Sequence, residues 1–108
     1  MILTTCPSME EAEKIARILL TERLAACVNT FQHVKSFYWW QDEIQEEQEI
    51  FLFIKTTKPL EQLVQKRIKE LHSYEVPALY ALDSTTIIDK AYMNWIEQET
   101  RSGDTYKK

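Results

Sequence analysis

The chain has 108 residues and a mass of 12.8 kDa, which suits one domain with one hydrophobic core. Hydrophobic residues make up 44% of it, so the chain is too apolar to be intrinsically disordered. Its net charge of -4 argues against a nucleic-acid binder that neutralises phosphates. The only glycine is Gly103, which excludes the glycine-rich phosphate loops of Walker and Rossmann nucleotide sites.

Neither a membrane span nor a disulfide scaffold is indicated. No stretch approaches the roughly 20 apolar residues that cross a bilayer, and the N-terminus lacks the basic segment of a secretory signal. The two cysteines, Cys6 and Cys27, form no CxxC pair. These features predict a protein of a reduced compartment, the cytoplasm, without membrane contacts.

The first elements are a short strand and an amphipathic helix. Residues 1–5 are apolar and predict the strand. Ser8 and Glu11 form a capping box, in which Ser8 accepts a backbone N–H and Glu11 reaches back to residue 8. A helical stripe follows at i, i+3, i+4, i+7 and i+8, and consists of Ala12, Ile15, Ala16, Leu19 and Leu20.

A long ribbon and a central strand come next. Residues 25–40 are rich in β-branched and aromatic side chains and predict a strand. The polar residues 41–43 suit a hairpin tip. The acidic run over 43–49 is typical of a solvated edge that discourages stray strand pairing, although it could also attract cations loosely. Residues 50–54 form a continuous apolar run, which predicts a central strand covered on both faces.

The remaining pattern completes a split βαβ arrangement. Thr57 as cap and Pro59 in the first turn open a second helix that stops near residues 72–73. Residues 77–82 predict another strand, and Asp89 caps a third helix. This order predicts an α+β, ferredoxin-like sandwich with an extra C-terminal helix. We expect both long helices on one face, one domain over residues 1–100, and a polar tail over 101–108.

The second strand is far longer than the usual 5–6 or so residues and would overhang its sheet. An exposed aromatic ribbon is an aggregation hazard unless another chain covers it, so we expect a homo-oligomer. The aromatic residues at the end of the ribbon are the expected interface anchors, although an aromatic ligand pocket is an alternative. They are Phe37, Tyr38, Trp39 and Trp40.

Five local sequences in register resemble the CutA family, which is named for divalent-cation tolerance. They are residues 22–29 (ERLAACVN), 37–40 (FYWW), 54–56 (IKT) and 72–77 (HSYEVP), and Tyr92-x-x-Trp95. The resemblance covers residues 1–100. It implies a ferredoxin-like, intertwined homotrimer of PII-like architecture with no established catalytic activity. It also links the chain to tolerance of copper and other divalent metals, and in animal members to maturation of a membrane cholinesterase.

The chain departs from the family pattern at several positions. Asp42 replaces a turn glycine, and aspartate tolerates the left-handed conformation better than most residues. Ser73 replaces the proline of His-Pro-Tyr, and Ala78 replaces a glutamate. Some bacterial relatives carry a cysteine where Thr4 stands and a histidine where Leu71 stands, so a metal site built on those ligands is incomplete here.

Three residues are candidate metal ligands, each with a plainer structural alternative. Cys27 suits Cu(I) as a thiolate, or packs as a small strand residue. Cys6 falls just past the first predicted strand, where we expect an exposed thiol, with a ligand or redox role as the alternative to a plain surface residue. His72 offers imidazole to copper or zinc, or complements the dipole at a helix C-terminus. We expect weak binding of copper or another divalent cation that folding does not require.

Lys55, Tyr74, Glu75 and Trp95 stand where strands end and helices begin, a common edge of a ligand cleft. We expect Lys55 to pair with Glu75, either as a structural ion pair or within an anion-binding cleft between subunits. This second interpretation gives the alternative function of a PII-like regulatory module that binds a small anion. A trimer that scaffolds protein partners is a further alternative. No spacing suggests a catalytic triad, and we expect no enzyme.

Overall fold

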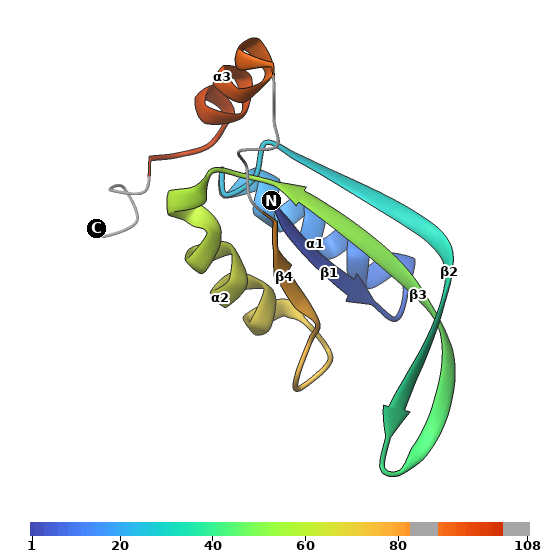
Figure 1. The fold of residues 1–108 in the computed structure, drawn as a ribbon. Helices are drawn as coiled ribbons and strands as arrows, with labels where there is room; N and C mark the ends of the chain where they lie inside the picture. Colours follow the sequence, from blue (N-terminus) through green and yellow to red (C-terminus); the bar gives the residue numbers. More distant parts are fainter. Residues whose placement is uncertain (83–88, 103–108) are drawn as a thin grey trace.

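The computed structural model describes residues 1–82 and 89–102 (Figure 1). Within these two ranges, four strands and three helices, with one 3-10 turn, follow one another in the expected order. They are β1 (Ile2–Cys6), α1 (Met9–Thr21), β2 (Cys27–Trp40), β3 (Glu43–Lys55), η1 (Lys58–Leu60), α2 (Glu61–Leu71), β4 (Leu79–Ala81) and α3 (Lys90–Glu99). The sheet is antiparallel with strand order β2-β3-β1-β4, which confirms the ferredoxin-like split βαβ fold with an added helix.

The molecule has two layers, with α1 and α2 together on one face of the sheet and α3 beyond one end of it (Figure 1). Side chains alternate along β3, so Leu52 and Ile54 point into the helix layer and are fully buried. The core joins these residues to the apolar stripes of both helices. Its members include Ile2, Ala12, Ile15, Leu19, Leu63, Val64 and Ile68.

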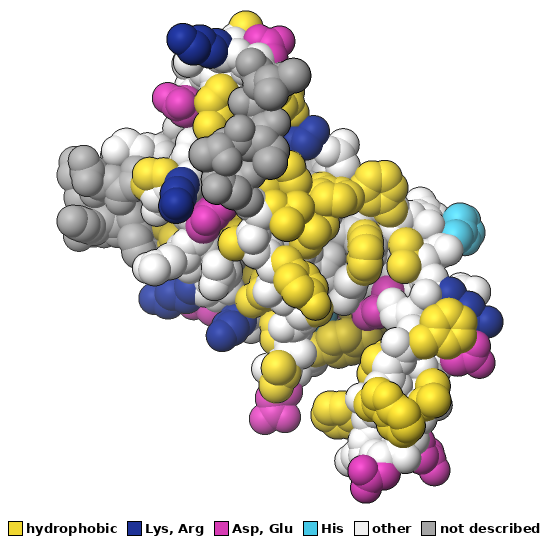
Figure 2. Space-filling model, viewed as in Figure 1, with side chains coloured by type: hydrophobic (Ala, Val, Ile, Leu, Met, Phe, Trp, Pro, Cys, Tyr) yellow, Lys and Arg dark blue, Asp and Glu magenta, His cyan; other side chains and the backbone are white. Residues whose placement is uncertain are grey.

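Over the other face of the sheet, which we call the open face, lies no helix from the described part of the chain. It presents side chains from all four strands: Leu3, Thr5, Phe31, Phe51, Phe53 and Tyr80. Figure 2 shows hydrophobic side chains gathered over this face and along the hairpin. The central position of β3 is confirmed. Phe51 and Phe53 remain half-buried within one chain, so the predicted cover of this second face stays a prediction.

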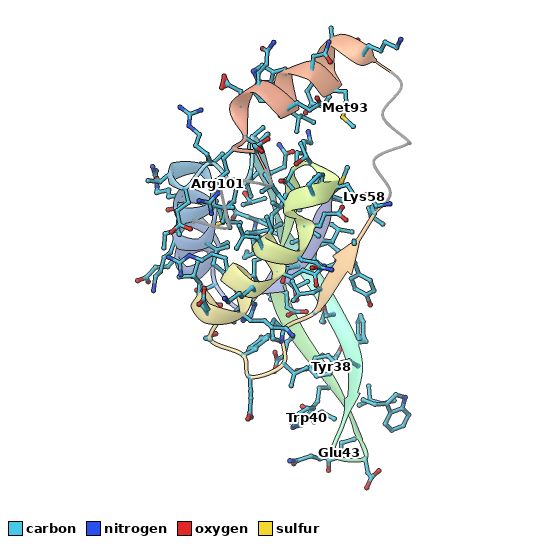
Figure 3. The ribbon with its side chains drawn as sticks, turned by 90° about the vertical axis from the view of Figure 1, so that its left-hand side faces the viewer. Tyr38, Trp40, Glu43, Lys58, Met93 and Arg101 are labelled. Atoms are coloured by element: carbon cyan, nitrogen blue, oxygen red, sulfur yellow. The ribbon has the colours of Figure 1, made fainter. Side chains whose placement is uncertain are left out.

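The β2–β3 hairpin is longer than the sequence predicted, because its second strand, β3, begins earlier than expected. Pairing runs from Cys27 opposite Lys55 to Trp40 opposite Glu43, whereas β1 pairs with β3 only as far as Ile50. The predicted strand over 50–54 therefore extends back to Glu43, because cross-strand pairing with β2 outweighs the acidic composition of that segment. Tyr38, Trp40 and Glu43 lie on the projecting part of the hairpin (Figure 3).

Local signals at the helix ends are largely confirmed. The Ser8 hydroxyl accepts the Glu11 N–H at 3.2 Å, and the Asp89 carboxylate accepts the Ala91 N–H at 2.9 Å. Thr57 occupies the N-cap position of the 3-10 turn but makes no side-chain capping bond. The last strand is shorter than predicted, and of the predicted tail only residues 101 and 102 fall within the described chain.

Two residues with positive φ close the hairpin. Gln41 has φ 51° and Asp42 has φ 65°, so both central residues of the turn are left-handed. Such a turn matches the twist of the strands that it joins, and it favours glycine, asparagine or aspartate. Asp42 thus forms the turn at a position where the family pattern has a glycine.

We expect Asp42→Val to lower the free energy of unfolding by about 1–2 kcal/mol, because a β-branched side chain is disfavoured at positive φ. Asp42→Gly serves as the matched control and should be at least as stable as the native chain. Urea denaturation followed by circular dichroism measures both, and a valine variant of native stability would contradict the assigned turn.

Candidate metal centre

Three side chains with metal-ligand atoms meet where β1 ends. Cys6 is the last residue of β1, Glu11 lies in the first turn of α1, and His72 directly follows α2. Their sulfur, carboxylate oxygen and imidazole nitrogen lie within 4.8 Å of one another. The fold thus brings two predicted ligands together and adds Glu11, which the sequence had indicated only as part of a helix cap.

The His72 ring is buried, and both of its nitrogens have hydrogen-bond partners. Nε2 lies 2.6 Å from the backbone oxygen of Thr5, and the Tyr74 N–H donates to Nδ1 at 3.0 Å. Because a carbonyl oxygen only accepts, this pattern assigns the proton to Nε2 and a lone pair to Nδ1. The His72 ring is therefore held by β1 on one side and by the loop after α2 on the other.

Glu11 does not complete the capping box that the sequence predicted. Its Oε2 accepts the Ser73 N–H at 3.1 Å and lies 3.3 Å from Nδ1 of His72. Glu11 of α1 thereby holds Ser73, which lies just beyond the end of α2. The carboxylate also stands beside the imidazole, where it would stabilise a positive charge on that ring or on a bound cation.

Cys6 is fully buried, so the expectation of an exposed thiol is wrong. As the last position of β1, it points into the helix layer, like Ile2 and Thr4. Burial, followed by the charges of Glu11 and Glu49, raises the pKa of the Cys6 thiol to about 12. Cys6 is therefore a protonated thiol at neutral pH, which makes it a poor nucleophile despite the neighbouring histidine and carboxylate.

The donor set suits a soft or borderline cation. Thiolate and imidazole favour Cu(I) and Zn(II), and the carboxylate adds negative charge. Binding requires Cys6 to lose its proton and Nδ1 of His72 to give up the bond from Tyr74. These two requirements limit the affinity of the site for a metal.

Cys27, the third predicted ligand, lies elsewhere. It pairs with Lys55, whereas Cys6 pairs with Ile50, so the two cysteines are separated along β3 by roughly 17 Å. The Cys27 thiol is half-buried and lies 3.8 Å from Oδ1 of Asn29. Cys27 therefore does not belong to the Cys6–Glu11–His72 cluster of its own chain.

The four predicted cleft residues fall into two groups at opposite ends of the sheet. The Lys55 ammonium lies 5.4 Å from the centre of the Tyr92 ring, which stacks on Trp95 at 5.7 Å. Tyr74 contacts His72 at the other end, beside the exposed Glu75. Within one chain, Lys55 and Glu75 do not form the expected ion pair. Tyr92 is the partner of Lys55 that the sequence analysis missed.

The surroundings of Tyr74 are acidic. Burial, followed by the charges of Glu49 and Glu47, raises the pKa of Tyr74 to about 12, with smaller contributions from Tyr38 and Glu11. An anion is disfavoured beside these carboxylates. The anion-binding interpretation is therefore better supported at the Lys55 end of the sheet than at Tyr74.

The four predicted interface residues, Phe37, Tyr38, Trp39 and Trp40, are exposed on the projecting hairpin. Trp39 is 70% exposed and Trp40 is 61% exposed, and Ile44 on the opposite strand is similarly bare. Large aromatic side chains in one exposed group mark an association surface.

Residues 1–99 match the sequence profile of the CutA1 divalent ion tolerance protein family. The chain belongs to this family. The divalent-cation tolerance protein CutA of Pyrococcus horikoshii is 41% identical over 101 residues, which cover 94% of this chain and 97% of that relative. The Thermus thermophilus CutA protein is 41% identical over 100 residues, covering 93% of this chain and 96% of the relative.

Solved CutA1 structures share the fold. The crystal structure of CutA1 from P. horikoshii has a TM-score of 0.87 at 40% identity, covering 94% of this chain and 97% of that one. CutA1 from Oryza sativa has a TM-score of 0.90 at 33% identity, covering 94% and 92%. Among residues 1–82 and 89–102, no helix is long and apolar enough to cross a membrane.

The two thiols should differ in reactivity. We expect a disulfide reagent such as DTNB to modify the half-buried Cys27 of the native CutA1-family chain at pH 8, while Cys6 stays unmodified until the protein unfolds. The absorbance of the released thiolate should indicate one fast thiol per chain in buffer and two in guanidinium chloride. If the fast reaction survives in Cys27→Ala and is lost in Cys6→Ala, the burial of Cys6 is contradicted.

Proposed function

We propose that this CutA1-family chain is a non-enzymatic homotrimer that contributes to divalent-metal tolerance and binds copper, or another soft or borderline cation, with modest affinity. The Cys6–Glu11–His72 cluster carries this proposal, because it brings three ligand atoms within 4.8 Å in a family named for metal tolerance. One sulfur, one nitrogen and one oxygen donor are a credible partial coordination shell, which a water molecule or another ligand would complete.

Folding does not depend on the metal in this proposal. The three ligand side chains already hold one another and the neighbouring backbone by hydrogen bonds, and they border a core of buried aliphatic residues. A bound cation would replace some of these hydrogen bonds with metal–ligand bonds. The site itself would already be formed before the cation binds. A catalytic role is not supported, since the raised pKa keeps Cys6 protonated.

The metal site is tested by replacing its ligands one at a time. Cys6→Ala, Glu11→Gln and His72→Gln should each weaken Cu(I) binding by about tenfold or more, because each removes a ligand of the cluster. An anaerobic competition with a chromophoric Cu(I) chelator measures the affinity, and Zn(II) is titrated in parallel.

Cys27→Ala and His33→Gln are the matched controls, since both residues lie outside the cluster. They should bind Cu(I) like the native chain. Native affinity in both Cys6→Ala and His72→Gln would remove the assigned site, and a loss confined to Cys27→Ala would move the site to the other end of the sheet.

The proposed trimer is supported by two bare surfaces. The open face carries half-buried phenylalanines, and the projecting hairpin carries Trp39 and Trp40. Monomeric proteins rarely expose contiguous apolar surface of this extent, and a β-ribbon without a cover invites uncontrolled pairing. Other copies of the same chain cover both surfaces in the proposed assembly.

We expect light scattering at low micromolar concentration to give the mass of three 12.8 kDa chains. Replacing Phe37 and Trp39 together by lysine should shift the particle toward a single chain, because two charges then occupy an apolar contact. Leu20→Lys, a comparable change on the exposed side of α1, is the control and should leave the mass unchanged. A monomeric native chain would contradict the proposed assembly.

The anion-binding alternative is supported by the Lys55 ammonium beside Tyr92 and opposed by the acidic surroundings of Tyr74. We place the protein in a reducing compartment, the cytoplasm, because both cysteines are free and lie far apart in the sheet. Relatives differ in this respect, since the Archaeoglobus fulgidus protein is described as periplasmic and the Arabidopsis thaliana protein as chloroplastic.

A further inference from the structure

One strip of side chains on the open face has a carboxylate at one end and an ammonium at the other. Along β3, the residues that point away from the helices are Glu49, Phe51, Phe53 and Lys55. They alternate with Ile50, Leu52 and Ile54, which pack in the core. The two charges thus share one face and are separated by two phenylalanines.

Glu49 is only 9% exposed, and its carboxylate makes no hydrogen bond or ion pair with any residue in 1–82 or 89–102. It lines a hollow of about 430 Å³ on the open face, together with apolar side chains that include Leu3, Phe51 and Leu82. Among the described residues that line this hollow, none is a lysine or an arginine. The charge of Glu49 contributes to the raised pKa values of Cys6, Tyr38 and Tyr74, and none of these three is a cation.

A carboxylate in this position needs a partner. Removing an ionised group from water is strongly unfavourable unless a cation or hydrogen-bond donors compensate it. Covering the open face with purely apolar surface would remove the water that still reaches Glu49 and increase this cost. Whatever covers the face must therefore bring a donor to Glu49.

Lys55 is the complementary group on the same face. Its ammonium is held against the Tyr92 ring at 5.4 Å, and it forms no ion pair within the described ranges. Six residues of extended strand, roughly 20 Å, separate it from Glu49, so the two cannot meet within one chain. A second copy that packs on the open face presents the same strip of side chains. Its Lys55 is then available to pair with Glu49 of the first copy.

We propose that Glu49 of each copy pairs with Lys55 of a neighbouring copy across the open face. This inference rests on the proposed trimer and specifies how its subunits recognise one another. Each copy donates Lys55 to one neighbour and receives the Lys55 of the other at its Glu49, which closes a head-to-tail ring. The phenylalanines between the charges supply the apolar contact, and the ion pair sets the relative position of the two strips.

Reversing the charges tests the pair in the full chain. Glu49→Lys and Lys55→Glu should each raise the concentration at which subunits dissociate by about tenfold or more, because like charges then face each other. The double reversal should return it to within about threefold of the native value. Light scattering over a dilution series, at one sub-denaturing urea concentration, measures dissociation.

Glu13→Lys and Lys69→Glu are matched controls, since they make the same charge changes on exposed positions of the helix layer. Both should dissociate like the native chain. Circular dichroism checks folding, and if a reversal unfolds the chain, Glu49→Gln and Lys55→Met replace it in a double-mutant cycle. That cycle should show that the two replacements are not additive.

The outcomes separate the pair from the trimer itself. The pair would be overturned, while the trimer stands, if the single reversals dissociate at the same concentration as the controls. It would also be overturned if the double reversal dissociates as readily as the weaker of the two single reversals. Additive effects in the double-mutant cycle would overturn it as well. A native chain that is monomeric at all concentrations would instead remove the proposed assembly, and the pair with it.

Discussion

The alternation of side chains along β3 is the constraint on which the rest of the structure depends. A strand has a period of two, so the apolar run over 50–54 must present apolar groups to both faces of the sheet. The two long helices cover one face and produce the dry core around Leu52 and Ile54. The other face keeps Phe51 and Phe53 half-bare, and the proposed trimer and the Glu49–Lys55 pair both follow from that asymmetry.

The metal centre depends on the same sheet at one end of β1. His72 is anchored by Thr5 and Tyr74, and Glu11 by Ser73, so the cluster is stable as a set of hydrogen bonds. Those bonds, and the protonated thiol of Cys6, compete with a bound cation. The arrangement suits a protein that takes up a metal reversibly better than one that needs it to fold.

Sequence patterns predicted the elements whose causes are local. The caps at Ser8 and Asp89 join groups two or three residues apart, and the left-handed turn at Asp42 depends on its own side chain. The early part of β3 was missed, because its acidic residues become strand only by pairing with β2. Glu11 was noticed for its spacing to Ser8, but its partners, Ser73 and His72, lie some sixty residues away.

The amino-acid sequence by itself determined the element order, the ferredoxin-like topology, the family and an aromatic ribbon that one chain leaves exposed. These follow from periodicity, from short-range hydrogen bonds and from motifs in register. Only the tertiary structure decided that Cys6 is buried, that Cys27 lies far from it, and that Lys55 meets Tyr92 rather than Glu75. Each of these depends on which elements pack beside a residue, and contacts between distant segments leave no trace in local sequence spacing.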